Sequence, residues 1–177
     1  MKILIVGNGA RESAIAMKLQ GDSRISKMYF ANGNATTAKL GQNVYEESVV
    51  ALRNFALKER IDLTIVGPEA PLVEGIVDDF KEHGLKIFGP RKRTAELEGS
   101  KAFSKKFMQT NNIKTAKAVV FDAYQDAMDY VKTQKFPLVI KASGLAGGKG
   151  VVIATDLAEA ELTIHRFMIE RIYGDAG

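Results

Sequence analysis

Short apolar runs and longer amphipathic segments alternate along the first 90 residues of the chain. The runs contain four or five residues, and short apolar stretches of this kind are typical of strands that are buried on both faces. They predict strands at residues 2–6, 27–31, 62–66 and 85–88. Apolar residues that recur at helical spacing predict helices over residues 11–20, 49–57 and 71–80. This alternation predicts a parallel sheet that is covered by helices on both faces.

The pattern changes in the second half of the chain. Helical spacing predicts helices over residues 100–110, 124–131 and 156–169, and residues 117–121 form a candidate strand. Two apolar runs, 137–142 and 151–155, are joined by residues 143–150. A connection this short predicts an antiparallel hairpin, since a parallel crossover needs more residues. An α+β layer that ends with a free sheet edge is expected to be incomplete.

Composition excludes several classes of protein. The 177 residues carry a formal net charge of +4 and contain no cysteine. A disulfide scaffold, a thiolate zinc site and a cysteine nucleophile are therefore excluded. The longest apolar runs are far shorter than the roughly 20 residues that a membrane-spanning helix needs. The basic cluster at residues 91–93 predicts a solvated turn or helix start. We expect a cytoplasmic protein that binds neither nucleic acid nor membranes.

A Gly-rich turn, Gly7-Asn8-Gly9, follows the first predicted strand and opens a helix. Glycine allows a tight turn and a close approach of the backbone, and the helix N-terminus presents free N–H groups to an anion. Arg11 and Glu12 at the helix start are a charged pair that can meet a phosphate and an amine. The turn therefore predicts a site for a nucleotide or a sugar phosphate, the alternative being a turn that only packs strand on helix.

A dinucleotide-binding oxidoreductase is a second interpretation of this turn. It requires a third glycine where this chain has Glu12, and a carboxylate at the end of the second strand. The second strand ends in Phe30-Ala31-Asn32, which contains no carboxylate. The sequence therefore disfavours a nicotinamide-dependent enzyme.

A second Gly-rich segment lies between the two apolar runs of the predicted hairpin. Residues 141–150 contain four glycines and two lysines, Lys141 and Lys149. Backbone N–H groups and ammonium charges in a mobile loop suit a polyphosphate. The spacing does not match a Walker A loop, because Gly150 follows Lys149 and a strand comes next. Residues 143–150, the Gly-rich flap, therefore predict a nucleotide-phosphate site, with a flexible hairpin turn as the alternative.

These segments together resemble the phosphoribosylamine–glycine ligase family of the ATP-grasp superfamily. The resemblance extends to the last residue and is carried by residues 5–12, 32–34, 66–73, 87–90, 97–103 and 139–151. It implies an α/β fold with a Rossmann-like, substrate-binding domain over residues 1–98. It further implies a linking helix and the start of an ATP-grasp domain over residues 99–120. Residues 121–177 would then form an incomplete ATP-grasp subdomain that carries the Gly-rich flap.

The family's reaction joins glycine to 5-phosphoribosylamine during purine synthesis, with hydrolysis of ATP to ADP and phosphate. The resemblance implies a glycyl phosphate intermediate, so that positioning and charge neutralisation matter more than a protein nucleophile. It implies ATP and Mg²⁺ or Mn²⁺ as cofactors. The metal ligands and the remaining ATP-grasp sheet are expected in a C-terminal half, which would be the partner of this chain. A truncated, non-catalytic module that binds a phosphoribosyl compound or a nucleotide is the alternative.

The resemblance also implies roles for individual residues. The residues that match the family's ATP-binding positions are Lys101, Lys141, Gly147, Gly148, Lys149 and Gly150. Those that match the phosphoribosylamine side are Gly7, Asn8, Gly9, Arg11, Glu12, Asn34, Gly67, Pro68 and Glu69. The chain departs from the family's usual Gly-Gly-Arg-Glu-His turn at Ala10 and Ser13, and Asn32 stands where the family usually has proline.

Overall fold

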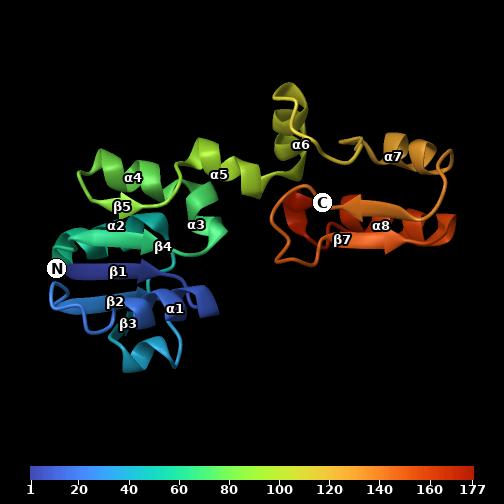
Figure 1. The fold of residues 1–177 in the computed structure, drawn as a ribbon. Coiled ribbons are helices and arrows are strands. Elements are labelled where there is room, and N and C mark those ends of the chain that lie inside the picture. The colour runs from blue at the N-terminus through green and yellow to red at the C-terminus, as the bar shows by residue number, and fades with distance from the viewer. The chain divides into compact units, whose positions relative to one another are not determined.

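The computed structural model of the protein describes residues 1–177, which form two compact units, Met1–Ala95 and Glu96–Gly177 (Figure 1). The first unit is built on a five-stranded parallel sheet with the order β3-β2-β1-β4-β5. Its strands are β1 (Lys2–Val6), β2 (Lys27–Ala31), β3 (Gln42–Val44), β4 (Leu63–Val66) and β5 (Ile87–Phe88). The predicted α/β class with a parallel sheet is confirmed.

Helices cover both faces of this sheet. They are α1 (Ala10–Leu19), the short 3₁₀ helix η1 (Thr37–Lys39), α2 (Val49–Glu59), α3 (Glu69–Glu74) and α4 (Ile76–Glu82), and α5 (Lys92–Gly99) comes after β5 in the chain. Successive residues of β1 point to opposite faces, as the pleat requires. Ile5 packs with Ala16 of α1 on one face, whereas Leu4 packs with Leu52 of α2 and Phe80 of α4 on the other. Each face of the central strand is thus covered by a separate layer of helices.

The second unit is a two-stranded antiparallel sheet that packs on two helices. Its elements are α6 (Lys101–Thr110), α7 (Tyr124–Val131), β6 (Leu138–Lys141), β7 (Val151–Ala154), α8 (Leu157–Met168) and the 3₁₀ helix η2 (Gly174–Ala176). Its core joins Val131 of α7, Ala154 of β7 and Ile164 of α8. The opposite face of the hairpin is open to solvent, since Val139 and Ile153 are 54% and 61% exposed. The predicted antiparallel hairpin is confirmed.

The start of α8 is capped by the side chain of Asp156. Asp156 accepts a hydrogen bond from the backbone N–H of Glu159 (2.9 Å), and the Glu159 carboxylate accepts one from the N–H of Thr155 (2.8 Å). The N–H of Glu159 in the first turn and that of Thr155 just before the cap are satisfied in this way.

We expect Asp156→Ala to lower the free energy of unfolding by about 1 kcal/mol, because it removes the acceptor of an N-cap hydrogen bond. Chemical denaturation of the purified chain measures this change. Asp122→Ala is the matched control, since Asp122 is exposed and makes no hydrogen bond. Equal stability of the two variants would show that the cap contributes nothing.

Two predictions of local structure differ from the structure, and two elements were not predicted in full. The helix predicted over residues 71–80 begins at Glu69 and is divided at Gly75, whose φ of 104° ends α3. Residues 117–121 form no strand, because Val119 is 55% exposed and has no partner strand. The short strand β3 was not predicted from the sequence, nor was the full extent of α5, which continues the helix start expected at residues 91–93.

Candidate functional site

The carboxyl ends of β1 and β4 form the switch point of the parallel sheet. The two strands are neighbours, and Val6 pairs with Val66. The chain continues from β1 to a strand on one side of it, and from β4 to a strand on the other side. In open α/β sheets, ligands bind outside the carboxyl ends of strands at such a point. The two segments that leave these ends are the turn Gly7–Gly9 and the segment Gly67–Glu69.

Gly7 lies at the point where these two segments approach each other. It has a φ of 120°, a conformation that residues with a side chain rarely adopt. A Cβ atom at Gly7 would lie 2.7 Å from Cδ of Pro68. Glycine is therefore required here both by the backbone conformation and by the neighbouring segment.

Glu12 and Arg11 of α1 connect the two segments. Glu12 is only 3% exposed, and its Oε2 accepts a hydrogen bond of 2.6 Å from the N–H of Gly9. A Cβ atom at Gly67 would lie 2.5 Å from Cδ of Glu12. The guanidinium of Arg11 donates to the carbonyl of Gly67. The charged pair that the sequence placed at the helix start therefore holds the two segments together.

Asn34 connects a third segment to the Gly7–Gly9 turn. Its amide Nδ2 donates to the carbonyl of Asn8 (2.8 Å) and to Oγ of Ser13 (3.0 Å). Its Oδ1 accepts from the N–H groups of Thr36 (2.8 Å) and Thr37 (3.0 Å). The turn is thus supported from the β2 side by a side chain that bonds both to the turn and to its own loop.

The structure accommodates all three departures from the family pattern, Ala10, Ser13 and Asn32. Ala10 is exposed, so that its methyl group displaces nothing in the protein. Ser13 bonds to Asn34, and its hydroxyl also donates to the carbonyl of Gly9 (3.2 Å). Asn32 has a φ of 57°, which asparagine tolerates better than most residues.

Glu69 is the first residue of α3 and is half-buried. Its carboxylate makes no hydrogen bond and no ion pair within the chain. A carboxylate at a helix N-terminus is favoured by the helix dipole. Glu69 therefore remains available to a ligand beside the Gly67 carbonyl.

The Gly-rich flap follows β6 in the second unit, and the N-terminus of α6 holds its first end. The ammonium Nζ of Lys101 donates to the carbonyl of Gly144 (3.0 Å), and the N–H of Lys101 donates to the carbonyl of Ser143 (2.8 Å). The N–H of Ala102 donates to the Ser143 hydroxyl (3.2 Å). Two separate segments, α6 and the flap, are joined by these contacts.

The tip of the flap is free of packing. Gly147 and Gly148 have φ values of 56° and 77°, and no atom lies within 4 Å of a Cβ placed on either residue. Lys149 beside them is exposed, as is Lys141 at the end of β6. Neither ammonium group makes a hydrogen bond or an ion pair within the chain. Gly150 closes the loop as a buried residue, where a Cβ atom would lie 2.6 Å from that of Ala146.

The flap has the chemistry that a polyphosphate requires. Two unpaired ammonium groups and the ammonium of Lys101 lie on or beside it, and glycines at positive φ can turn their N–H groups toward an anion. A divalent cation is different, because the chain contains no cluster of acidic or histidine side chains that could hold one. The residues present therefore fit the phosphates of a nucleotide and do not fit magnesium.

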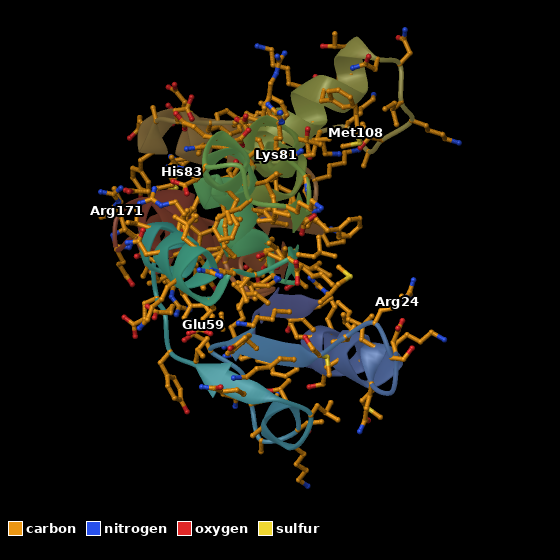
Figure 2. The ribbon with its side chains drawn as sticks, turned by 90° about the vertical axis from the view of Figure 1, so that its left-hand side faces the viewer. Arg24, Glu59, Lys81, His83, Met108 and Arg171 are labelled. Atoms are coloured by element: carbon orange, nitrogen blue, oxygen red, sulfur yellow. The ribbon has the colours of Figure 1, made fainter.

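The carboxylates with shifted pKa values lie away from both the ends of β1 and β4 and the Gly-rich flap. The hydrogen bond from the Tyr29 hydroxyl lowers the pKa of Glu59, and that from Arg24 holds the pKa of Asp22 well below its usual range. Figure 2 shows Glu59 at the end of α2 and Arg24 in the loop before β2. Both lie at the amino end of the sheet, so these shifts do not mark the candidate site.

Sequence reasoning missed several residues that support the site. Thr37 is fully buried, and its hydroxyl accepts from the N–H of Asn34 (2.8 Å) and donates to Oδ1 of Asn43 (2.9 Å). Tyr173 donates from its hydroxyl to the carbonyl of Lys149 (2.6 Å). The sequence does not indicate that Thr37 is buried or that the Tyr173 hydroxyl reaches a carbonyl 24 residues away, so neither residue could be recognised from its local sequence.

Two family models match the chain from end to end. They are the N domain of phosphoribosylglycinamide synthetase, over residues 1–98, and the ATP-grasp (A) domain of the same enzyme, over residues 99–177. The phosphoribosylamine–glycine ligase of Clostridium acetobutylicum is 51% identical over 100% of this chain and 43% of its own length. That of Escherichia coli K12 is 48% identical over 100% of this chain and 42% of its own length.

Solved structures show the same similarity. A crystal structure of phosphoribosylamine–glycine ligase from Thermotoga maritima matches 98% of this chain and 41% of its own, with a TM-score of 0.74 and 32% identity. Biotin carboxylase from Campylobacter jejuni shares the fold with a TM-score of 0.75 at 17% identity, over 99% of this chain and 43% of its own. The chain thus spans less than half the length of these relatives. No helix of the structure has the length and apolar character needed to cross a membrane.

Proposed function

Since this chain belongs to the phosphoribosylglycinamide synthetase family, we propose that it is part of an ATP-dependent ligase that joins glycine to 5-phosphoribosylamine. The observation that carries this proposal is the match to both family models, together with about half-identical relatives along the whole chain. The chain spans 43% of the length of the first of these relatives, and the proposed activity is that of a protein of the full length. We propose that this reaction takes place in the cytoplasm.

The proposed reaction has two steps. The carboxylate of glycine accepts the γ-phosphoryl group of ATP, which gives glycyl phosphate and ADP. The amine of phosphoribosylamine then attacks the carbonyl carbon, a C–N bond forms, and phosphate leaves with the C–O bonding electrons. Such chemistry needs alignment of the reactants and neutralisation of phosphate charge more than a protein nucleophile.

The carboxyl ends of β1 and β4 are proposed to bind phosphoribosylamine. The residues involved are those of the Gly7–Glu12 turn, Asn34, and Gly67, Pro68 and Glu69. Support comes from their place at the sheet's switch point, from the free N–H groups at the start of α1, and from the unpaired carboxylate of Glu69. The hydrogen bonds of Arg11, Glu12 and Asn34 keep this arrangement rigid before a ligand binds.

The flap is proposed to bind the phosphates of ATP. Lys101, Lys141 and Lys149 supply positive charge, and Gly147, Gly148 and Gly150 supply backbone that can approach the phosphates closely. Magnesium would need ligands from outside residues 1–177, because this chain has no cluster of side chains for it.

Replacement of Glu69 tests the substrate side of this proposal. The chain is joined to the remaining C-terminal portion of the Clostridium acetobutylicum relative, and Glu69→Ala is assayed in this completed enzyme. We expect the KM for phosphoribosylamine to rise about tenfold, because this factor corresponds to the free energy of one lost hydrogen bond to a charged group. The KM for ATP should stay unchanged.

Glu74→Ala is the matched control, because Glu74 is an exposed glutamate at the other end of the same helix. An unchanged KM for phosphoribosylamine in the Glu69 variant would move the substrate site away from α3. Binding of ATP by the chain without any ligase activity of the completed enzyme would favour a non-catalytic binding module.

A further inference from the structure

The Gly-rich flap, residues 143–150, is held at both of its ends, while its tip is free. The first end is held by α6 through the hydrogen bonds of Lys101 and Ala102 to Ser143 and Gly144. A second contact at this end comes from η2, where the N–H of Gly144 donates to the carbonyl of Ala176 (3.0 Å). A loop that is fixed at its ends moves mainly at its tip.

Tyr173 holds the other end of the flap. Its hydroxyl donates to the carbonyl of Lys149 at 2.6 Å. Its ring packs edge-on against Phe167 of α8, with 5.2 Å between the ring centroids. The ring is therefore anchored on the core of the second unit, and the hydroxyl extends this anchor to the backbone of the flap.

This hydrogen bond can restrict the position of the Lys149 backbone. Among the side chains of the unit, Tyr173 alone bonds to the backbone of Lys149, whose own ammonium group has no partner in the chain. Residues 147 and 148 before it are glycines that pack on nothing. Without the Tyr173 contact, the fixed points nearest to the tip would be two backbone hydrogen bonds. The N–H of Lys149 donates to the carbonyl of Ala146 (3.0 Å), and that of Ala142 donates to the carbonyl of Gly150 (2.9 Å).

We propose that Tyr173 is a positioning residue for the flap: its hydroxyl fixes the Lys149 carbonyl and thereby sets where the Lys149 ammonium can reach. The part of this inference that concerns ATP rests on the proposed function. The part that concerns the flap rests on the hydrogen bond alone. Tyr173 touches no substrate and acts only through Lys149.

Tyr173→Phe tests the inference because it removes the hydroxyl and keeps the ring on Phe167. Hydrogen exchange is measured on the Lys149 amide of the purified chain without any ligand. We expect exchange to become about two- to tenfold faster, which corresponds to the loss of one hydrogen bond. Unchanged exchange at Lys149 would overturn the proposal.

Tyr130→Phe is the matched control in the same unit. Tyr130 packs its ring on Phe121 at 5.0 Å, and its hydroxyl makes no hydrogen bond in the chain. This variant should leave the exchange of Lys149 unchanged. Equal acceleration in both variants would show a general loosening of the unit and would also overturn the proposal.

The kinetics of the completed enzyme distinguish a positioning role of Tyr173 from a purely structural one. We expect Tyr173→Phe to raise the KM for ATP about two- to tenfold, with kcat and the KM for glycine unchanged. Faster exchange with an unchanged KM for ATP would overturn the positioning role. A completed enzyme without ATP-dependent activity in any form would contradict the proposed function, and the exchange rates would then still decide whether Tyr173 fixes the flap.

Discussion

Lys149→Ala in the completed enzyme is expected to lose about 10- to 100-fold in kcat/KM for ATP, since hydrogen bonds to charged groups contribute about 1.5–3 kcal/mol. Lys149 is exposed, and its ammonium group has no partner in the chain. Its removal therefore breaks no contact that stabilises the fold. The melting temperature should stay within the range of ordinary surface substitutions. Steady-state kinetics with ATP as the varied substrate and thermal unfolding measure the two effects.

Lys135→Ala is the matched control for this variant. Lys135 is an exposed lysine of the same unit that makes no hydrogen bond or ion pair. Its replacement should change neither the kinetics nor the melting temperature. Parallel losses of melting temperature and activity in the Lys149 variant would contradict a role in ATP binding and indicate a structural one.

Gly67→Ala is expected to destabilise the first unit by about 2 kcal/mol, as overpacking of a buried site does. Gly67 is buried, and a Cβ atom there would lie 2.5 Å from Cδ of Glu12. Glu12 is itself buried and bonded to the N–H of Gly9, so that its side chain can move away only by breaking that bond. Chemical denaturation of the chain measures the loss.

A double-mutant cycle shows whether Glu12 is the cause. Glu12→Ala removes the side chain that the new methyl group would meet, so the two substitutions together should cost less than the sum of the single ones. A coupling of about 1 kcal/mol or more is expected for residues in direct contact. Additive losses would mean that the strain at residue 67 comes from elsewhere.

The sequence predicted the central strands β1, β2 and β4 well, because each is a compact run of mainly apolar residues with a clear end. Residues 3–6 form an unbroken apolar run after Lys2, and together they are the central strand β1, which has a neighbouring strand on each side. The strand β3 could not be predicted from the sequence, since Gln42–Val44 has only three residues and one buried side chain. The candidate strand at residues 117–121 was wrong, because β-branched residues such as Val119 favour strands only where a partner strand exists.

The division between α3 and α4 shows a second limit. Apolar residues keep helical spacing across Gly75, so periodicity alone predicted one helix. Gly75 takes a φ of 104°, and it accommodates a turn that any other residue would resist. Periodicity reports which face is buried, and it does not report whether the backbone is continuous.

The segments that form the candidate site could be predicted from the sequence, but the contacts between their side chains could not. The two Gly-rich segments and their lysines were evident from residue types alone. The burial of Glu12 was not, because a glutamate at a helix start is usually solvated, and here it fills the space that Gly67 leaves. The tether from Tyr173 to Lys149 joins residues 24 positions apart, and such a contact has no local pattern.

Release of ADP tests the central claim most directly. The purified chain is assayed with Mg-ATP, glycine and freshly generated phosphoribosylamine, alone and mixed with the remaining C-terminal portion of the Clostridium acetobutylicum relative. The account predicts ADP release that depends on both glycine and phosphoribosylamine in the mixture, and none from the chain alone. Activity of the chain alone, or a mixture that stays inactive although both parts are folded, would contradict it.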